Sequence, residues 1–112
     1  MHSNSKFKDW ESFYNDLRVE KNISEKCIKI SKAHIKNLKE RYGISDSDFS
    51  LAKTRILTYY VPGKKTFGNI RFNKNSIWIE NKYSGLEIID HVQQEDDYDM
   101  HKVKIESIED YQ

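Results

Sequence analysis

The spacing of the apolar residues changes once along the chain, near Thr54. Before this point apolar side chains recur at steps of three and four residues, which places them on one face of a helix. From Thr54 onward they alternate with polar residues, which is typical of half-buried strands. The pattern therefore predicts helices in the first half of the chain and a sheet in the second half.

The first predicted helix covers residues 7–20. Its acidic residues fall away from the apolar face, and Ser5 or Asn4 is a suitable N-cap. The apolar face consists of Phe7, Trp10, Phe13, Tyr14 and Leu17.

The second predicted helix covers residues 24–42 and has clearer ends. Ser24 is a typical N-cap, and Gly43 is a typical stop because glycine readily adopts the left-handed conformation. Lysines follow one another at helical spacing on the side opposite the apolar face. The apolar face consists of Cys27, Ile30, His34, Leu38 and Tyr42.

The rest of the chain predicts five strands that follow a short turn of helix over residues 48–53. Short turns between consecutive strands favour an antiparallel meander. The predicted strands are 55–61, 66–72, 76–83, 86–92 and 100–106.

Together these elements predict one α+β domain over residues 1–112. Two N-terminal helices, within about 7–42, pack on a roughly five-stranded antiparallel meander sheet within about 54–106. A chain of 112 residues has the length of one common domain and is long enough for one modest core.

Charge is sorted along the chain, although the net charge is only +1. Residues 26–82 carry a local balance of +9, and residues 83–112 carry −7. Such segregated charge steers partners, or lets the two parts bind each other, without naming a partner.

The cellular setting follows from cysteine use and hydropathy. Cys27 is the only cysteine, so no disulfide forms within the chain, and its place on an apolar helix face predicts burial. The apolar runs are too short to span a membrane, and residues 1–8 lack an apolar signal core. We therefore expect a cytoplasmic protein with no membrane partner, placed in the host cytosol if a phage encodes it.

A basic surface with aromatic residues among its cations predicts one binding function. Clustered cations suit phosphates, and exposed aromatic faces suit unpaired bases. A nucleic-acid-binding module that uses this helix and hairpin is therefore one hypothesis. The residues are Lys29, Lys32, Lys36, Lys39, Arg55, Tyr59, Tyr60, Lys64, Lys65, Arg71 and Lys74.

The acidic cluster of Glu95, Asp96, Asp97 and Asp99 favours a solvated loop that keeps a sheet edge soluble. It lacks the ligand spacing and the glycine of a calcium-binding loop. It also makes a homodimer conceivable, in which the acidic end of one copy meets the basic helix of another.

No cofactor, metal or assembled catalytic set is predicted. His91 and His101 flank the acidic cluster without a recognised metal-ligand spacing, and His34 lies on an apolar helix face. The segment ending in Glu80 and Lys82 resembles the second half of the PD-(D/E)xK nuclease signature, which implies a Mg²⁺ carboxylate and a charge-stabilising lysine. The preceding acid of that signature is missing, since residues 49–79 contain no Asp or Glu.

The remaining hypothesis is a small non-enzymatic module that binds another protein. Tyrosine and tryptophan are more numerous than one modest core needs, and they often anchor interfaces. The Lys- and Asn-rich composition suits an accessory or inhibitor protein of a phage or mobile element acting on a host protein complex. The aromatic residues concerned are Trp10, Tyr14, Tyr59, Tyr60, Trp78, Tyr83 and Tyr98.

Overall fold

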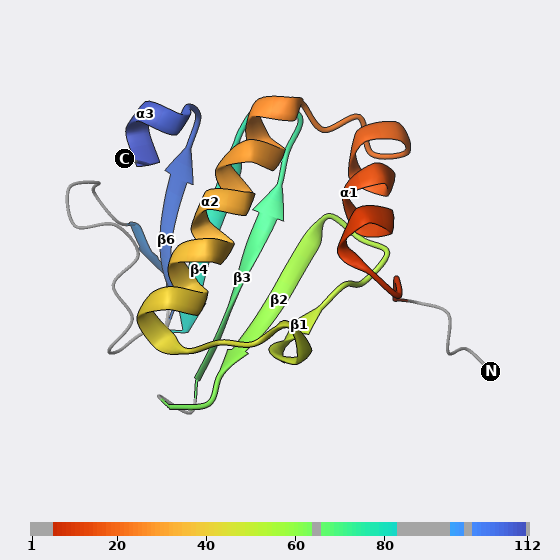
Figure 1. Cartoon of the computed structure of the whole chain (residues 1–112). Coiled ribbons are helices and arrows are strands. Elements are labelled where there is room, and N and C mark those ends of the chain that lie inside the picture. The colour runs from red at the N-terminus through yellow and green to blue at the C-terminus, as the bar shows by residue number, and fades with distance from the viewer. Residues whose placement is uncertain (1–5, 64–65, 83–94, 98–99, 112) are drawn as a thin grey trace.

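The computed structural model of this chain describes residues 6–63, 66–82, 95–97 and 100–111 (Figure 1). Two long helices come first and the strands follow, as the change of apolar spacing predicts. The elements are α1 (Trp10–Val19), α2 (Glu25–Tyr42), the 3₁₀ helix η1 (Asp46–Asp48), β1 (Phe49–Ser50), β2 (Ile56–Val61), β3 (Thr66–Phe72), β4 (Ile77–Lys82), β5 (Glu95–Asp97), β6 (Met100–Ile105) and α3 (Ile108–Tyr111).

The strands form one open antiparallel sheet in the order β1-β2-β3-β4-β6-β5. Figure 1 shows α2 lying across one face of this sheet, with α1 beside it on the side of β1 and β2. The predicted α+β class is therefore confirmed. None of the helices within the described ranges is long and apolar enough to cross a membrane.

The core lies between α2 and the covered face of the sheet. Leu57, Ile70, Ile79 and Val103 sit side by side in register across β2, β3, β4 and β6, and each is at most 1% exposed. Because successive strand residues point to opposite faces, this row places every second residue of the central strands under the helices. From α2 the core receives Cys27, Ile28, Ile30, Ile35 and Leu38.

The ends of α2 agree with the sequence prediction. Ser24 is the N-cap in an extended conformation. Gly43 ends the helix in the left-handed region at φ 67°, and its N–H donates to the carbonyl of Lys39 at 3.0 Å. Glycine suits this position because a positive φ brings a Cβ too close to the backbone.

The predicted start of α1 is wrong by three residues. Phe7 lies outside the helix, and its N–H donates to the Leu51 carbonyl at 2.7 Å, next to a bridge between Lys6 and Ala52. The N-cap is Asp9, whose carboxylate accepts the N–H of Ser12 at 2.8 Å. A local cap and long-range strand pairing therefore delay the helix beyond the first apolar residue.

The helical turn predicted over residues 48–53 is also wrong. Ser45 and Asp48 form a reciprocal capping box around η1, which ends after Asp48. Phe49 then pairs with Tyr59 in β1 and is 8% exposed. Burial of the Phe49 ring against the sheet thus outweighs the local capping pattern.

The last strands depart from a simple meander. β4 pairs with β3 on one side and with β6, which is not the next predicted strand along the chain, on the other. The predicted strand 86–92 itself falls outside the described residues. Glu95–Asp97, predicted as part of an acidic loop, forms the edge strand β5, in which Glu95 lies opposite Lys102 in register.

Gly68 marks a close approach within the covered face. It lies between Tyr59 and Asn81 in register, and the Tyr59 hydroxyl donates to Asn81 Oδ1 at 2.8 Å. A Cβ at Gly68 would lie 2.6 Å from the Glu80 carbonyl oxygen and 2.7 Å from the Tyr59 hydroxyl. The buried hydrogen bond therefore requires a residue without a side chain beneath it.

His34 and Cys27 are both buried in the core, as the apolar face predicts. His34 is 2% exposed, and burial followed by the positive charge of Arg41 lowers its pKa to about 3. Burial raises the pKa of the Cys27 thiol. Both side chains are therefore neutral at pH 7.

We expect stability to fall in acid because of His34. Below pH 6.5 the unfolded chain binds a proton that the folded chain refuses until about pH 3, so His34 costs up to about 1.4 kcal/mol per pH unit in this window. His34→Leu should flatten the slope of unfolding free energy between pH 6.5 and 5, measured by urea denaturation. Equal slopes in both proteins would refute this assignment.

Gly68→Ala should destabilise the fold by about 1–3 kcal/mol, because the new Cβ overlaps backbone and a hydrogen-bonded hydroxyl. Gly63→Ala is the matched control, since open space surrounds Gly63 and its φ is not left-handed. The control should stay within about 0.5 kcal/mol of the parent in the same denaturation measurement. Similar values for both variants would contradict the close approach.

Candidate functional site

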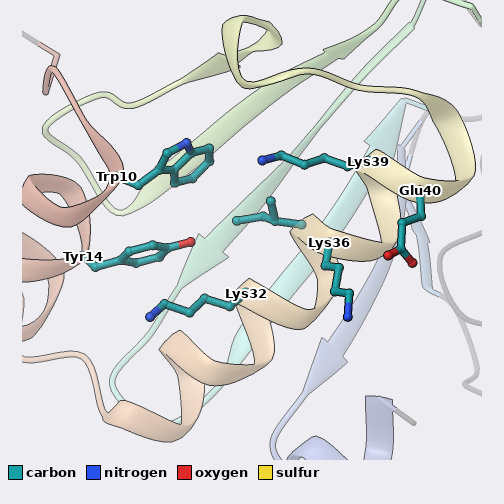
Figure 2. Close-up of a pocket in the computed structure, with 7 residues that line it drawn as sticks. Trp10, Tyr14, Lys32, Lys36, Lys39 and Glu40 are labelled. Carbon is teal, nitrogen blue, oxygen red and sulfur yellow. The ribbon is translucent and has the colours of Figure 1, made fainter.

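A groove runs between α1 and α2 on the helical side of the molecule (Figure 2). Its volume is about 480 Å³, within the range of ordinary ligand and peptide pockets. One wall comes from α1, and the other wall and the floor come from α2. The lining residues are Trp10, Tyr14, Lys32, Ile35, Lys36, Lys39 and Glu40.

The α1 wall is a stacked aromatic pair. Trp10 and Tyr14 are four residues apart and therefore share one helix face. Their rings lie 5.8 Å apart at 26°, and Trp10 also packs edge-on against Phe49 at 5.1 Å. Tyr14 is 6% exposed, whereas Trp10 is partly exposed at the rim of the core. The wall is thus held rigidly by the core behind it.

Two lysines of α2 reach across the groove to these rings. Lys32 Nζ lies 4.9 Å from the centroid of Tyr14, and Lys39 Nζ lies 5.8 Å from that of Trp10. Figure 2 shows both chains extended from α2 toward the aromatic wall. Such cation–π contacts hold flexible lysine stems over apolar surface and order the groove before any partner arrives.

Asp46 connects the aromatic wall with one of these two lysines. Its carboxylate accepts the indole N–H of Trp10 at 3.2 Å and forms an ion pair with Lys39. The Lys39 ammonium holds the pKa of the Asp46 carboxyl below its usual value, so the ion pair persists at neutral pH. The charge of Lys39 is therefore largely compensated.

The charges of Lys32 and Lys36, unlike that of Lys39, are not compensated by a carboxylate among the described residues. Within the described part of the chain, no carboxylate lies within ion-pair distance of either ammonium. Glu40 lines the other end of the groove, one helical turn beyond Lys36. The groove is therefore positive toward Lys32 and acidic toward Glu40.

Only three of the four lysines predicted to form a row on α2 line the groove. Lys32, Lys36 and Lys39 line it, whereas Lys29 borders a separate depression of about 290 Å³ beside Ile108. The four lysines follow one helix, but the groove lies on the side of that helix toward α1, whereas α3 lies near its N-terminal half. Packing thus divides a row that is continuous in sequence.

The hairpin residues predicted to join the lysines lie elsewhere. Tyr59 is 1% exposed in the core, so its prediction as a surface stacking residue is wrong. By strand alternation, Tyr60, Arg71 and Trp78 point to the sheet face opposite the helices. Arg55 and Lys74 are also separate, since Arg55 precedes β2 and Lys74 lies in the turn between β3 and β4. The predicted residues Lys64 and Lys65 fall outside the described residues.

The opposite sheet face has its own apolar and charged groups. Tyr60 and Phe67 face each other in register and are 46% and 44% exposed. Farther along the strands, Arg71 and Lys102 border a depression of about 420 Å³ that also contains Trp78 and Glu80. Tyr60 and Phe67 are thus exposed aromatics that do not line the groove between the helices.

Among the described residues, Glu80 pairs with a cation and not with further metal-ligating side chains. Its carboxylate is 6% exposed and pairs with Arg71 at 3.5 Å. No group of three His, Cys, Asp or Glu side chains suited to a metal ion occurs among the described residues. Asp90, His91 and Asp99 lie outside those residues, and only the backbone is described for Glu95, Asp96, Asp97 and His101.

Sequence reasoning placed Trp10 and Tyr14 on the buried face of the first helix and did not connect them with the lysine row. Ile35 and Glu40 were also not singled out as site residues. One signal was available, because the four-residue step between the rings matches the helical steps among Lys32, Lys36 and Lys39. That match has meaning only once α1 and α2 are known to be neighbours.

Comparison with models of protein families, with curated proteins and with solved structures gave no match. Any assignment of function therefore depends on the geometry and charge described above.

Tyr14 provides a test of this wall. Burial raises the pKa of its phenol to about 12, while a hydrogen bond with Ser31 acts in the opposite direction. Tyr14→Phe should cost about 1 kcal/mol at pH 8, where the lost hydrogen bond dominates. Between pH 10 and 12 the unfolded parent chain loses the Tyr14 proton first, so the parent loses stability and the difference should shrink.

The measurement is urea denaturation at pH 8 and at several values above pH 9. Tyr60→Phe, at an exposed position, controls for the removal of any one tyrosine hydroxyl. A difference between parent and Tyr14→Phe that stays constant to pH 11 would show that Tyr14 is not buried as described.

Proposed function

We propose that this chain is a small non-enzymatic protein-binding module and that the groove between α1 and α2 is its docking surface. The observation that carries the proposal is the preordered groove, in which an apolar floor and stacked rings are bordered by extended lysines. Tryptophan and tyrosine in concave, well-packed positions are frequent anchors of protein interfaces. Preordering lowers the entropy cost of binding, which favours a small surface of this kind.

The state of the aromatic rings favours a protein over a nucleic acid. Unpaired bases need open ring faces on which to stack. In the groove, Tyr14 is 6% exposed and stacks on Trp10, and each ring also has a lysine ammonium over it. The most exposed aromatic rings of the described residues, Tyr60 and Phe67, lie on the sheet face opposite the helices that form the groove.

The charges of the groove support the same choice. No arginine, the residue that grips phosphate and guanine with two hydrogen bonds, lines it. Lys39 is paired with Asp46, and Glu40 would repel a phosphate backbone that continues past Lys36. Two uncompensated lysines suit a limited acidic contact better than a continuous phosphate track.

A binding role rather than catalysis is supported by the described titratable groups. The nucleophile Cys27 and the base His34 are both neutral and enclosed in the core. We place this role in the cytosol and retain the hypothesis of a phage or mobile-element accessory protein acting on a host protein complex. That setting is supported by the single cysteine and the Lys- and Asn-rich composition alone.

The test is capture of partners from a nuclease-treated bacterial lysate with matched variants. Lys36→Trp fills the groove from an exposed helix position, and Lys29→Trp makes the same change outside it. We expect the parent and Lys29→Trp to retain the same protein and Lys36→Trp to lose at least about tenfold of it. Equal retention by both variants would refute the groove as the docking surface.

Omitting nuclease in a parallel sample tests the nucleic-acid alternative. Retained material that disappears on nuclease treatment would favour that alternative. Its affinity should then fall steeply with salt, with a slope set by the number of phosphates contacted.

A further inference from the structure

We propose that the groove accepts an acidic, extended segment of its protein partner, with carboxylates facing Lys32 and Lys36 and an apolar side chain facing the Trp10–Tyr14 wall. This inference rests on the proposed function and adds the chemistry of the partner. It depends on three features of the described residues, which are the distribution of charge, the spacing of the lysines and the different character of the two walls.

The distribution of charge indicates where an acidic group would bind. Asp46 neutralises Lys39, whereas Lys32 and Lys36 have no carboxylate within ion-pair distance among the described residues. Glu40 makes the opposite end unfavourable for a further acid. An acidic group is therefore attracted to one end of the groove, which gives the bound segment a direction.

The spacing of the lysines indicates the conformation of the segment. Lys32 and Lys36 are four residues apart on α2, which corresponds to about 6 Å along the helix axis. In an extended chain, side chains on the same side recur every second residue, or about 6.6 Å. Acids at alternate positions of an extended segment therefore repeat at about the same distance as the backbone positions of Lys32 and Lys36 along α2.

The two walls explain why the intervening residue should be apolar. In an extended segment the residue between two acids points to the other side. In the groove this side contains Ile35 and the partly exposed ring of Trp10, next to the Tyr14 ring over which the Lys32 ammonium lies. An acidic–apolar–acidic pattern thus satisfies both walls at once.

The contacts with the lysines contribute direction and specificity more than affinity. Exposed ion pairs are screened by salt and individually weak, whereas aromatic anchors dominate most interfaces. Charge reversal replaces these weak attractions by repulsion between like charges, so we expect it to weaken binding strongly. The fold should stay intact, because both side chains are exposed.

The test uses two short peptides and an internal fluorophore. The probes are acetylated Glu-Leu-Glu-Leu-Glu and its counterpart Lys-Leu-Lys-Leu-Lys. The chain has two tryptophans, so Trp78→Phe leaves Trp10 as the only tryptophan reporter of the groove. Titrations at low salt compare the parent with Lys32→Glu/Lys36→Glu and with the equally charged control Lys26→Glu/Lys29→Glu, which lies outside the groove.

We expect the glutamate peptide to bind the parent saturably and to lose at least about tenfold in affinity on Lys32→Glu/Lys36→Glu. The control should stay within about twofold of the parent, and the lysine peptide should now prefer Lys32→Glu/Lys36→Glu. A glutamate peptide that does not bind at about millimolar concentration, or that binds both double variants equally, overturns the inference.

The same experiments distinguish this inference from other occupants of the groove and from a failure of the proposed docking function. If Lys36→Trp loses its captured protein while the glutamate peptide fails, the groove is a docking surface for a partner that is not acidic. Tighter binding of an oligothymidine to the parent overturns the inference in favour of nucleic acid. A dimer in light scattering that Lys32→Glu/Lys36→Glu dissociates overturns it in favour of a second copy of this chain.

Discussion

Burial of one sheet face beneath α2 is the constraint on which the rest of the structure depends. The row of Leu57, Ile70, Ile79 and Val103 crosses four strands in register, and the aliphatic side of α2 covers it. Removal of this apolar surface from water is the largest favourable term available to a domain of this size. It sets the register of the strands, because a slip of one residue would turn every inward side chain outward.

The groove is a consequence of how the two helices share that face. Phe13 and Leu17 of α1 are completely buried, which fixes the rotation of this helix. In this orientation of α1, Trp10 and Tyr14 lie at the margin of the core on the side that faces α2. The lysines of α2 then have aromatic faces within reach, so cation–π contacts order side chains that would otherwise remain flexible in solvent.

The fold distributes the basic residues of the 26–82 segment among different surfaces and ion pairs. Within the basic segment 26–82, Lys39 is engaged by Asp46 and Arg71 by Glu80. Part of the basic excess is therefore taken up in local ion pairs on separate surfaces. Lys32 and Lys36 remain together beside an apolar floor, which is why this region, and not the basic segment as a whole, is the candidate site.

The order of apolar residues alone predicts the class of fold, because helical and strand periodicity are local properties of the chain. The end of α2 is also a local property, since Gly43 adopts the left-handed conformation that stops the helix. Tertiary structure decided the start of α1, the pairing of β4 with β6 and the strand at Glu95–Asp97, because each depends on a partner distant in sequence. It also buried Tyr59 and brought Trp10 and Tyr14 to the lysines. A periodic pattern states which face of an element is apolar, but only packing determines which other element that face meets.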